Sequence, residues 1–343
     1  MLTRLILSIV LLLALGLPAS AQTGDATTAP TLSQTLEEAS ALSQLKAVIV
    51  ARNGEVLAER SYRGHSVTAA TNIKSASKSI ISALVGIAID EGVLDGVDQK
   101  IAPLLDSDLP RDPDPRMADI TIGHLLSMQA GLERTSGANY GGWISSSNWV
   151  RDALARPFVD EPGGGMLYST GSSHLLSAIL TRATGRSTLE LARDWLGPVD
   201  GFSIAGWERD PQGIYLGGNQ MAMSTRSLLA FGELYRSGGK SPDGRQIVST
   251  EWIEASWQPR TRSRFTGDGY GYGWFLRRIA GREVRYAWGY GGQMIYIVPS
   301  LELTVVMTSD ADSPAGRSGH RDSLHELLGS IISIVETSDS AAG

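Results

Sequence analysis

The strongest helical pattern in the chain runs over residues 74–90, with the sequence KSASKSIISALVGIAID. Apolar residues occupy most of the circumference of this predicted helix, and a helix that is apolar all round lies in a protein interior. Its first turn, however, carries the polar residues Lys74, Ser75, Ser77 and Lys78. A polar first turn leading into a buried helix predicts that the helix begins at the floor of a cleft.

Strand-like runs lie towards both ends of the chain. Residues 46–51 and 55–62 form two of them, and the Asn53-Gly54 pair between them is a strong hairpin signal. Four more runs follow near the C-terminus, at residues 271–277, 283–288, 293–298 and 303–309. An amphipathic helix is predicted to close the chain over residues 323–336.

The middle of the chain is mainly helical. Apolar periodicity predicts helices at residues 32–45, 101–105, 121–129, 173–184, 187–196 and 225–237. This order of elements favours an α+β fold, in which helices flank a central antiparallel sheet and a mainly helical insertion occupies about residues 101–240. We expect one domain over residues 32–343, with its two ends packed together.

Composition and charge narrow the class of protein. Hydrophobic residues make up 42% of the 343 residues and charged residues 19%, as in an ordinary globular protein. The net charge is −6 and the sequence contains no basic block, so we expect neither a nucleic-acid partner nor binding to an anionic membrane surface.

The N-terminus has the pattern of an export signal. Arg4 precedes an apolar run at residues 5–17, and Ala19-Ser20-Ala21 resembles a cleavage site. The run is shorter than the ~20 residues of a membrane span, so we expect cleavage after Ala21 and no stable membrane anchor. Residues 22–31 are predicted to be a flexible linker. The chain lacks cysteine, which excludes disulfides and a lipidated cysteine, and it is expected to be periplasmic or secreted.

Ser75 and Lys78 form an S-x-x-K pattern at the start of the predicted buried helix. Residues three apart on a helix share one face, so this spacing brings a hydroxyl and an amine together. The positive end of the helix dipole would favour a developing oxyanion at the same place. The pattern alone also fits a serine cap of a helix, and Ser43/Lys46 and Ser237/Lys240 match it without preceding a buried helix.

Several longer motifs accompany this pattern in a particular order. They are NIKSASKSIISALVGIAIDEG, ITIGHLLSMQAGL, EPGGGMLYSTGSSHLLSAILTRATG, GGNQMAMSTRSLLAFGELY, GYGYGWF and WGYGGQMIYIVPSLELTVVMTS. With them, residues 36–335 resemble the serine β-lactamase and penicillin-binding-protein superfamily. The resemblance is strongest to the branch of class C β-lactamases, D-alanyl peptidases and esterases, and within it to 6-aminohexanoate-oligomer hydrolase-like proteins.

The resemblance implies a catalytic group of three residues. Ser75 matches the serine that becomes acylated, Lys78 the neighbouring lysine, and Tyr168 the tyrosine of the Y-x-N motif. Thr170 stands where that motif has asparagine. The resemblance does not decide whether Lys78 or Tyr168 accepts the serine proton.

A second implied group lies near the C-terminus. The K-T-G motif aligns with Tyr290-Gly291-Gly292, so a substrate-binding lysine is replaced by tyrosine. Tyr290 is expected to be either a wall of the cleft or a hydrogen-bond donor. The backbone N–H of Gln293 is expected to complete an oxyanion hole with that of Ser75.

These features predict a serine hydrolase that forms an acyl-enzyme with small esters or amides and uses no cofactor. The alternative is a penicillin-binding-like module, D-alanyl peptidase or β-lactamase acting on cell-wall peptides or β-lactams. No H-E-x-x-H motif and no cysteine are present, so we expect no metal site.

Four further expectations concern the surroundings of the site. The loops around Trp143 and Ser263 are expected to shape the pocket, and Arg262 or Arg264 is a possible replacement for the missing lysine. Of the histidines, His124 and His174 are expected in the core, and His320 and His325 on the surface of the last helix.

Overall fold

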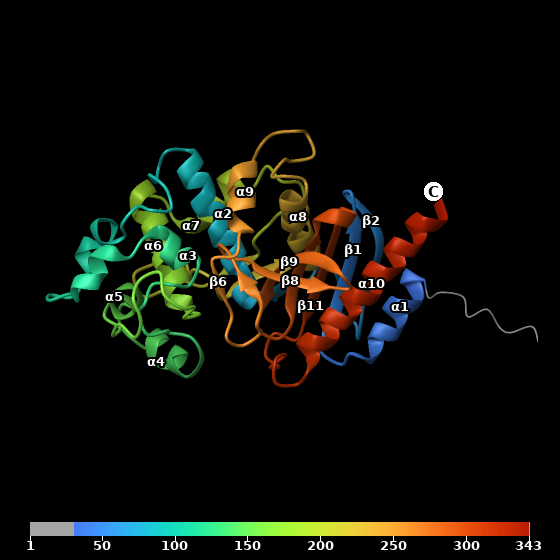
Figure 1. The fold of residues 1–343 in the computed structure, drawn as a ribbon, viewed down its shortest axis with the longest axis horizontal. Helices are drawn as coiled ribbons and strands as arrows, with labels where there is room; N and C mark the ends of the chain where they lie inside the picture. The colour runs from blue at the N-terminus through green and yellow to red at the C-terminus, as the bar shows by residue number, and fades with distance from the viewer. Residues whose placement is uncertain (1–30, 343) are drawn as a thin grey trace, which may run out of the picture.

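The computed structural model describes residues 31–342 and places the two ends of this region side by side. Helix α1 (Leu32–Glu38) contacts the last helix, α10 (His320–Ala342), and both cover one face of a large sheet at the same end of the molecule (Figure 1). Helices α3 (Ile122–Leu126), α5 (Trp149–Leu154), α6 (Thr170–Thr184) and α7 (Thr188–Trp195) form the other end (Figure 1). The predicted α+β fold with packed chain ends is confirmed.

The large sheet has eight strands in the order β2-β1-β11-β10-β9-β8-β7-β6, and every neighbouring pair is antiparallel. Its central strands bury side chains on both faces, because helices cover each side. The strands are β1 (Leu45–Arg52), β2 (Glu55–Ser61), β6 (Thr261–Arg262), β7 (Gly269–Tyr270), β8 (Phe275–Ile279), β9 (Arg282–Gly289), β10 (Gln293–Val298) and β11 (Leu303–Ser309).

The remaining helices pack on the opposite face of the sheet from α1 and α10 or extend beyond it. They are α2 (Ser77–Asp90), α3 (Ile122–Leu126), α4 (Tyr140–Ile144), α5 (Trp149–Leu154), α6 (Thr170–Thr184), α7 (Thr188–Trp195), α8 (Thr225–Arg236) and α9 (Thr250–Ser256). Short 3₁₀ turns are η1 (Ala39–Ala41), η2 (Lys74–Ala76), η3 (Ala102–Leu104), η4 (Asp106–Asp108), η5 (Pro115–Asp119), η6 (Gly137–Asn139) and η7 (Pro299–Leu301).

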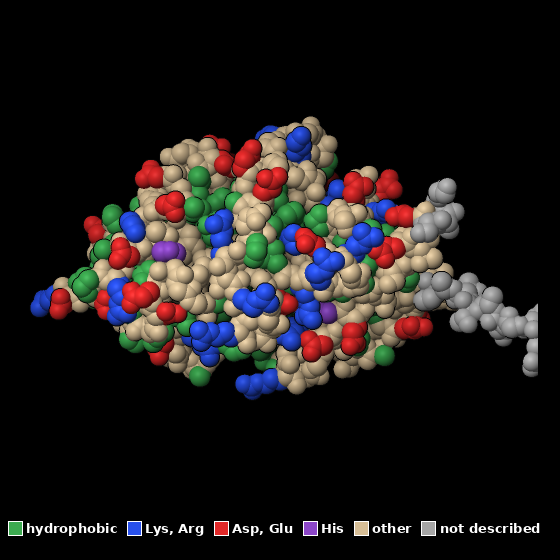
Figure 2. Space-filling model, viewed as in Figure 1, with side chains coloured by type: hydrophobic (Ala, Val, Ile, Leu, Met, Phe, Trp, Pro, Cys, Tyr) green, Lys and Arg blue, Asp and Glu red, His purple; other side chains and the backbone are tan. Residues whose placement is uncertain are grey.

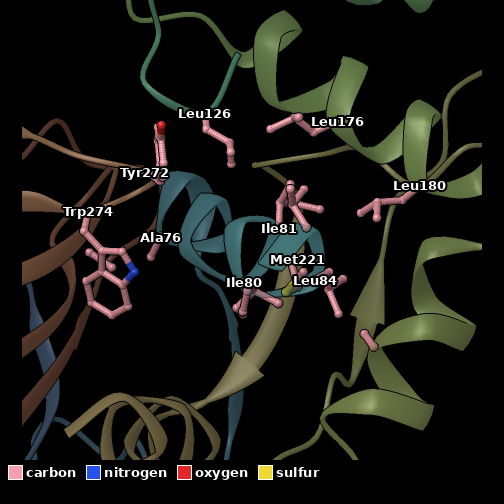
Figure 3. Packing of buried hydrophobic residues seen from close by; sticks show 14 of the residues in the cluster. Ala76, Ile80, Ile81, Leu84, Leu126, Leu176, Leu180, Met221, Tyr272 and Trp274 are labelled. Atoms are coloured by element: carbon pink, nitrogen blue, oxygen red, sulfur yellow. The ribbon is translucent and has the colours of Figure 1, made fainter. Parts of the chain in front are cut away.

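Helix α2 is the centre of the larger hydrophobic core. Residues 77–88 are all buried, as the apolar pattern predicted. Ile80, Ile81 and Leu84 point away from the helix in several directions, while Trp274 lies on one side of the helix near Ala76 and Leu176 on the other (Figure 3). The helix therefore joins the sheet to the helical end of the molecule, and its first turn lies where the two parts meet.

A small antiparallel sheet supports the start of α2. Its strands β3 (Ala70–Asn72), β5 (Met221–Ser224) and β4 (Gly206–Trp207) are arranged in the order β3-β5-β4. The N–H of Ile73 donates to the carbonyl of Met221 at 2.8 Å, which continues the pairing to the residue before η2. A distant segment thus fixes the turn that carries Ser75.

Several predicted elements differ from the structure, and three of the differences are clear in the local structure. The helix expected at residues 32–45 ends in η1, and the helix expected to begin at Lys74 begins with η2. The strand expected at residues 271–277 is broken by a turn in which the N–H of Gly271 donates to the carbonyl of Trp274. Gly273 has φ +79° there and packs against the Lys78 carbonyl, a contact that local sequence does not reveal.

Two further expectations concern parts of the chain at its ends. The predicted signal segment and nearly all of the predicted linker lie outside the described residues. Within the described part, no helix combines the length and apolar character that crossing a membrane requires.

His320 and His325 are buried rather than on the surface, since His320 bonds to Ser309 and His325 to Tyr296 across the helix–sheet interface.

Candidate functional site

Ser75 lies in the middle of η2, half-buried, directly before the long helix α2. The preceding residue, Lys74, has φ +51°, which is uncommon for a residue with a side chain. Its N–H donates to the Asn72 side chain at 2.9 Å, and its carbonyl accepts from the Ser77 hydroxyl at 2.7 Å. These contacts hold the serine in a tight turn at the positive end of α2.

Lys78 follows one helical turn later and is only 3% exposed. Its Nζ contacts three oxygen atoms: Ser75 Oγ at 3.0 Å, the Gly218 carbonyl at 2.7 Å and Thr170 Oγ1 at 3.4 Å. Burial disfavours the charged form and lowers the pKa of Lys78 to about 7. A substantial fraction of this lysine is therefore a neutral amine at neutral pH.

The three contacts match the bonding capacity of a neutral amine. Two N–H groups can donate to Gly218 and Thr170, and the lone pair then faces the Ser75 hydroxyl. After protonation the third N–H would point back at Ser75 Oγ. Lys78 in this geometry can thus accept the proton of the Ser75 hydroxyl and later return a proton through the same contact.

Tyr168 lies just before α6 and forms a side-chain hydrogen bond with Ser75. Burial raises the pKa of Tyr168 to about 12, and the bond to Ser75 opposes this increase. Its ring is 5.1 Å from Lys78 Nζ and packs against Tyr270 and Phe275. The structure thus brings together Ser75, Lys78 and Tyr168, and of the two possible proton acceptors Lys78 has the pKa nearer to neutral pH.

Thr170, at the start of α6, is held by a residue that the sequence did not single out. The Ser136 hydroxyl lies 3.0 Å from Thr170 Oγ1 and accepts a bond from the Thr170 N–H at 2.8 Å. The sequence did not single out Gly218 either, whose carbonyl contacts Lys78 from 140 positions away. Neither contact follows from a local pattern.

The predicted residues at the β9–β10 turn have different environments. Tyr290 is 50% exposed, as a cleft wall or donor would be. A side chain at Gly291 or Gly292 would collide with the protein's own atoms, among them the Asp310 carbonyl and Leu324. The packing of the turn therefore accounts for these two glycines, and their contact with substrate stays a prediction.

Gln293 is fully buried in the sheet. Its amide bonds in both directions with the backbone of Ser309, and the residue pairs with Gly289 across β9 and β10. This register directs its N–H towards β9. The predicted role of Gln293 as an oxyanion donor remains untested, and the register favours a different residue.

The uncovered edge of β9 indicates which residue could be the oxyanion donor instead of Gln293. Strand β8 pairs with β9 only as far as Tyr286, and the two-residue turn of this hairpin fixes which N–H groups face β8. By alternation, the N–H of Trp288 faces the open edge, and Tyr290 follows directly after the end of β9 at Gly289. A Cβ at Gly289 would lie 2.1 Å from the Ile73 carbonyl, so this edge packs directly against the turn of Ser75.

The loops expected to shape the pocket differ in their burial. Trp143 belongs to the short helix α4 and is fully buried against Trp149 and His174, so it is a core residue rather than a pocket wall. Ser263 is also buried and caps its own loop by accepting from the N–H groups of Phe265 and Thr266. The exposed part of this loop is formed by its neighbours.

The two arginines suggested as replacements for the missing lysine lie apart. The Arg264 guanidinium lies next to Gly165, in the loop that leads to Tyr168. Arg262 donates to the Gly267 carbonyl and lines a groove with Arg277, Arg278 and Arg285. Arg side chains gather over β8 and β9 (Figure 2), where Glu283 and Asp268 pair with three of these arginines.

The two histidines expected in the core differ in their burial. His174 is fully buried with both ring nitrogens bonded, and His124 is half-buried and caps α3 together with Thr121. Among the residues that the structure describes, His, Cys, Asp and Glu side chains form no group of three or more that could hold a metal ion.

A serine beside a buried lysine, at the start of the central helix of this fold, is the arrangement typical of serine hydrolases with an S-x-x-K motif. A sequence model of the β-lactamase family matches residues 39–329, most of the chain. The chain belongs to the β-lactamase family.

Known relatives agree with this assignment. The 6-aminohexanoate-dimer hydrolase of Paenarthrobacter ureafaciens is 25% identical over 321 residues, which cover 86% of this chain and 79% of the relative. Among solved structures, a class C β-lactamase from Rhodobacter sphaeroides has a TM-score of 0.66 at 15% identity, with 88% and 99% of the two chains covered. An octameric penicillin-binding protein homologue from Pyrococcus abyssi has a TM-score of 0.67 at 19% identity, with 87% of this chain and 76% of that chain covered.

Proposed function

We propose that this protein hydrolyses small esters or amides through an acyl-enzyme on Ser75. The observation that carries the proposal is the contact of Lys78 Nζ with Ser75 Oγ at 3.0 Å, made by a lysine whose pKa is lowered to about 7. A neutral amine in hydrogen-bond contact with a hydroxyl is the arrangement that activates a serine nucleophile.

The proposed reaction has two halves. Lys78 takes the hydroxyl proton as Ser75 Oγ bonds to the substrate carbonyl carbon, and the backbone N–H groups of Ser75 and Tyr290 stabilise the oxyanion. The bond to the leaving group then breaks. That group takes a proton from the Lys78 ammonium, either directly or through the Tyr168 phenol. Water attacks the acyl group in the second half, which releases the acid and restores the Ser75 hydroxyl.

Substrate preference follows from the position that has Tyr290 in place of lysine. A hydrogen bond that involves a charged group contributes about 1.5–3 kcal/mol, against about 0.5–1.5 for a neutral one. A substrate carboxylate therefore loses roughly 1–1.5 kcal/mol, or about tenfold in affinity. This loss disfavours β-lactams and D-alanyl peptides. The name of the Paenarthrobacter relative supports small amides as a further substrate class.

The first prediction compares substrates directly. We expect kcat/KM for p-nitrophenyl acetate or butyrate to exceed that for a chromogenic cephalosporin by at least tenfold. A Ser75→Ala variant measured in parallel removes any background hydrolysis. A cephalosporin hydrolysed faster than both esters would contradict the substrate assignment, and Arg264, close to the loop before Tyr168, would then be the first cation to replace.

A further inference from the structure

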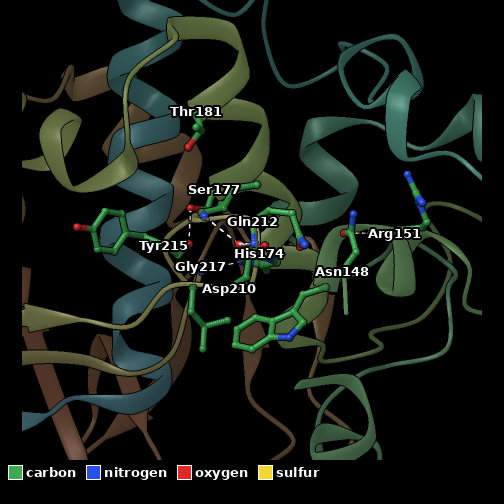
Figure 4. Close-up of polar contacts among 12 residues, drawn as sticks. Asn148, Arg151, His174, Ser177, Thr181, Asp210, Gln212, Tyr215 and Gly217 are labelled. Carbon is green, nitrogen blue, oxygen red and sulfur yellow. Dashed lines mark hydrogen bonds and ion pairs between the residues drawn. The ribbon is translucent and has the colours of Figure 1, made fainter. Parts of the chain in front are cut away.

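The buried pair His174–Asp210 lies behind the proposed catalytic lysine, and neither residue belongs to a catalytic motif. Both side chains are completely buried, and His174 Nε2 lies 3.0 Å from Asp210 Oδ2. The imidazole lies against the indole rings of Trp143 and Trp149, at ring-centre distances of 5.7 and 5.8 Å. Figure 4 shows this pair between α6 and the segment that includes Tyr215 and Gly217.

Hydrogen bonds from α6 align this segment residue by residue. The Ser177 hydroxyl donates to the Tyr215 carbonyl at 2.7 Å, and the Ser173 hydroxyl donates to the Gly217 carbonyl at 3.0 Å. The N–H of Gly217 donates to His174 Nδ1 at 3.3 Å. The next carbonyl along the chain, that of Gly218, accepts from Lys78 Nζ.

The glycines of this segment allow a very close approach. A Cβ at Gly217 would lie 2.1 Å from the Ser173 carbonyl. A Cβ at Gly218 would lie 2.4 Å from Ser173 Oγ and 2.5 Å from Lys78 Cγ. The segment is therefore packed between α6 and the aliphatic stem of Lys78, and it closes the space around the lysine to water.

The contacts also determine which nitrogen of His174 carries the proton. Because Nδ1 accepts from the Gly217 N–H, the ring proton is on Nε2, where it is donated to Asp210. Asp210 is itself fixed, since its Oδ1 accepts from the N–H groups of Gln212 and Ile214 at 2.9 and 2.8 Å. The carboxylate thus holds the imidazole in the one tautomer that can accept from Gly217.

We infer that His174 and Asp210 are positioning residues that keep Lys78 desolvated by fixing the Gly217–Gly218 backbone over it. This inference rests on the proposed function of Lys78 as the proton acceptor. Loosening the backbone admits water to the lysine, and since burial is what lowers the pKa of Lys78, water raises that pKa towards its ordinary value. Less of the lysine is then neutral at pH 7.

Three conservative variants separate this role from general packing. His174→Asn keeps an acceptor near the Nδ1 position for Gly217 and loses the bond to Asp210. His174→Gln keeps a donor near the Nε2 position and loses the acceptor. Asp210→Asn places an amide N–H against Nε2 of His174, so that the ring proton moves to Nδ1. Two N–H groups, those of Nδ1 and Gly217, then face each other, and the hydrogen bond between them is lost.

The direct readout is the titration of Lys78, which is monitored by NMR of ¹³Cε-labelled lysine in the full chain. The sequence has only five lysines, Lys46, Lys74, Lys78, Lys100 and Lys240, and the Lys78 signal is the one missing in Lys78→Met. We expect it to titrate near pH 7 in the wild type and in His174→Asn, and about one pH unit higher in His174→Gln and Asp210→Asn.

Kinetics give a second readout with its own signature. A rise of about one unit in the Lys78 titration lowers kcat/KM for p-nitrophenyl butyrate about fivefold at pH 7 and leaves it nearly unchanged at pH 9. A variant that merely disturbs packing loses activity equally at both pH values. Thermal unfolding of each variant verifies that it is folded.

Two results would overturn the inference. One is an unchanged Lys78 titration in folded Asp210→Asn and His174→Gln, and the other is an equal shift in both His174 variants. If the wild type hydrolyses no ester while the NMR shifts follow the expected pattern, the proposed function fails, and only the effect of His174 and Asp210 on the titration of Lys78 is confirmed.

Discussion

Lys78 combines burial with a proposed function that requires it to change charge. A buried ammonium is costly in free energy, and this cost lowers the pKa of Lys78 from 10.5 to about 7. Between these values the unfolded chain holds a proton that the folded protein has released. The unfolding free energy therefore rises with pH across this range, and below pH 7 the lysine destabilises the fold most.

A methionine at this position should reveal the cost. Lys78→Met is expected to stabilise the protein more at pH 6 than at pH 9, by about 2–3 kcal/mol of unfolding free energy. Urea unfolding at the two pH values measures this difference, and any constant effect of lost contacts cancels. Lys100→Met, at an exposed lysine, is the control for loss of a positive charge. An effect of Lys78→Met that is equal at both pH values would show that Lys78 is not desolvated.

At the residue scale, the sequence predicted the side chains that form a motif and missed those that act through the backbone or from a distance. Ser75 and Lys78 are neighbours on one helical turn, so their contact follows from spacing. The Gly218 carbonyl and the Ser136 hydroxyl reach the same site by tertiary packing alone. A hydroxyl or a carbonyl carries no distinguishing pattern in the sequence.

At the element scale, periodicity found the sheet and the central helix because both are regular over many residues. It failed where an element bends to meet another. The turn at residues 271–274 exists because Gly273 packs against α2, and Ser82 donates to the Tyr272 carbonyl at 2.8 Å. Such a break depends on a partner about 190 positions away, which a local window cannot include.

The contact between β9 and η2 leads to a prediction at this scale. A Cβ at Gly289 would lie 2.1 Å from the Ile73 carbonyl, so Gly289→Ala must displace the strand edge or the turn of Ser75. Because misplacement of reacting groups by about 1 Å can cost about 100-fold in rate, we expect kcat/KM to fall by about that factor in protein that stays folded.

Gly142→Ala is the matched control, since a Cβ at Gly142 meets no atom within 4 Å outside its chain neighbours and the backbone of its own helix. Ester hydrolysis and thermal unfolding are measured for both variants. Wild-type kcat/KM in Gly289→Ala would show that the edge of β9 is not part of the reacting site.

At the scale of the whole molecule, the family and the fold agree with the sequence, and one expectation concerns residues outside the described part. We propose that the chain is exported and cleaved after Ala21. Intact-mass measurement of protein recovered from outside the cytoplasm should give an N-terminus at Gln22. Recovery in the membrane with residues 5–17 retained would instead indicate an anchor.

The central claim is that Ser75 is the nucleophile of this molecule, and covalent labelling tests it most directly. A fluorophosphonate probe should add one label, and peptide mass mapping should locate it on Ser75. Labelling should disappear in folded Ser75→Ala and persist in Ser43→Ala and Ser237→Ala, which alter the two other serines of the same spacing. A label that remains in Ser75→Ala, or that maps to Ser43 or Ser237, would contradict the account.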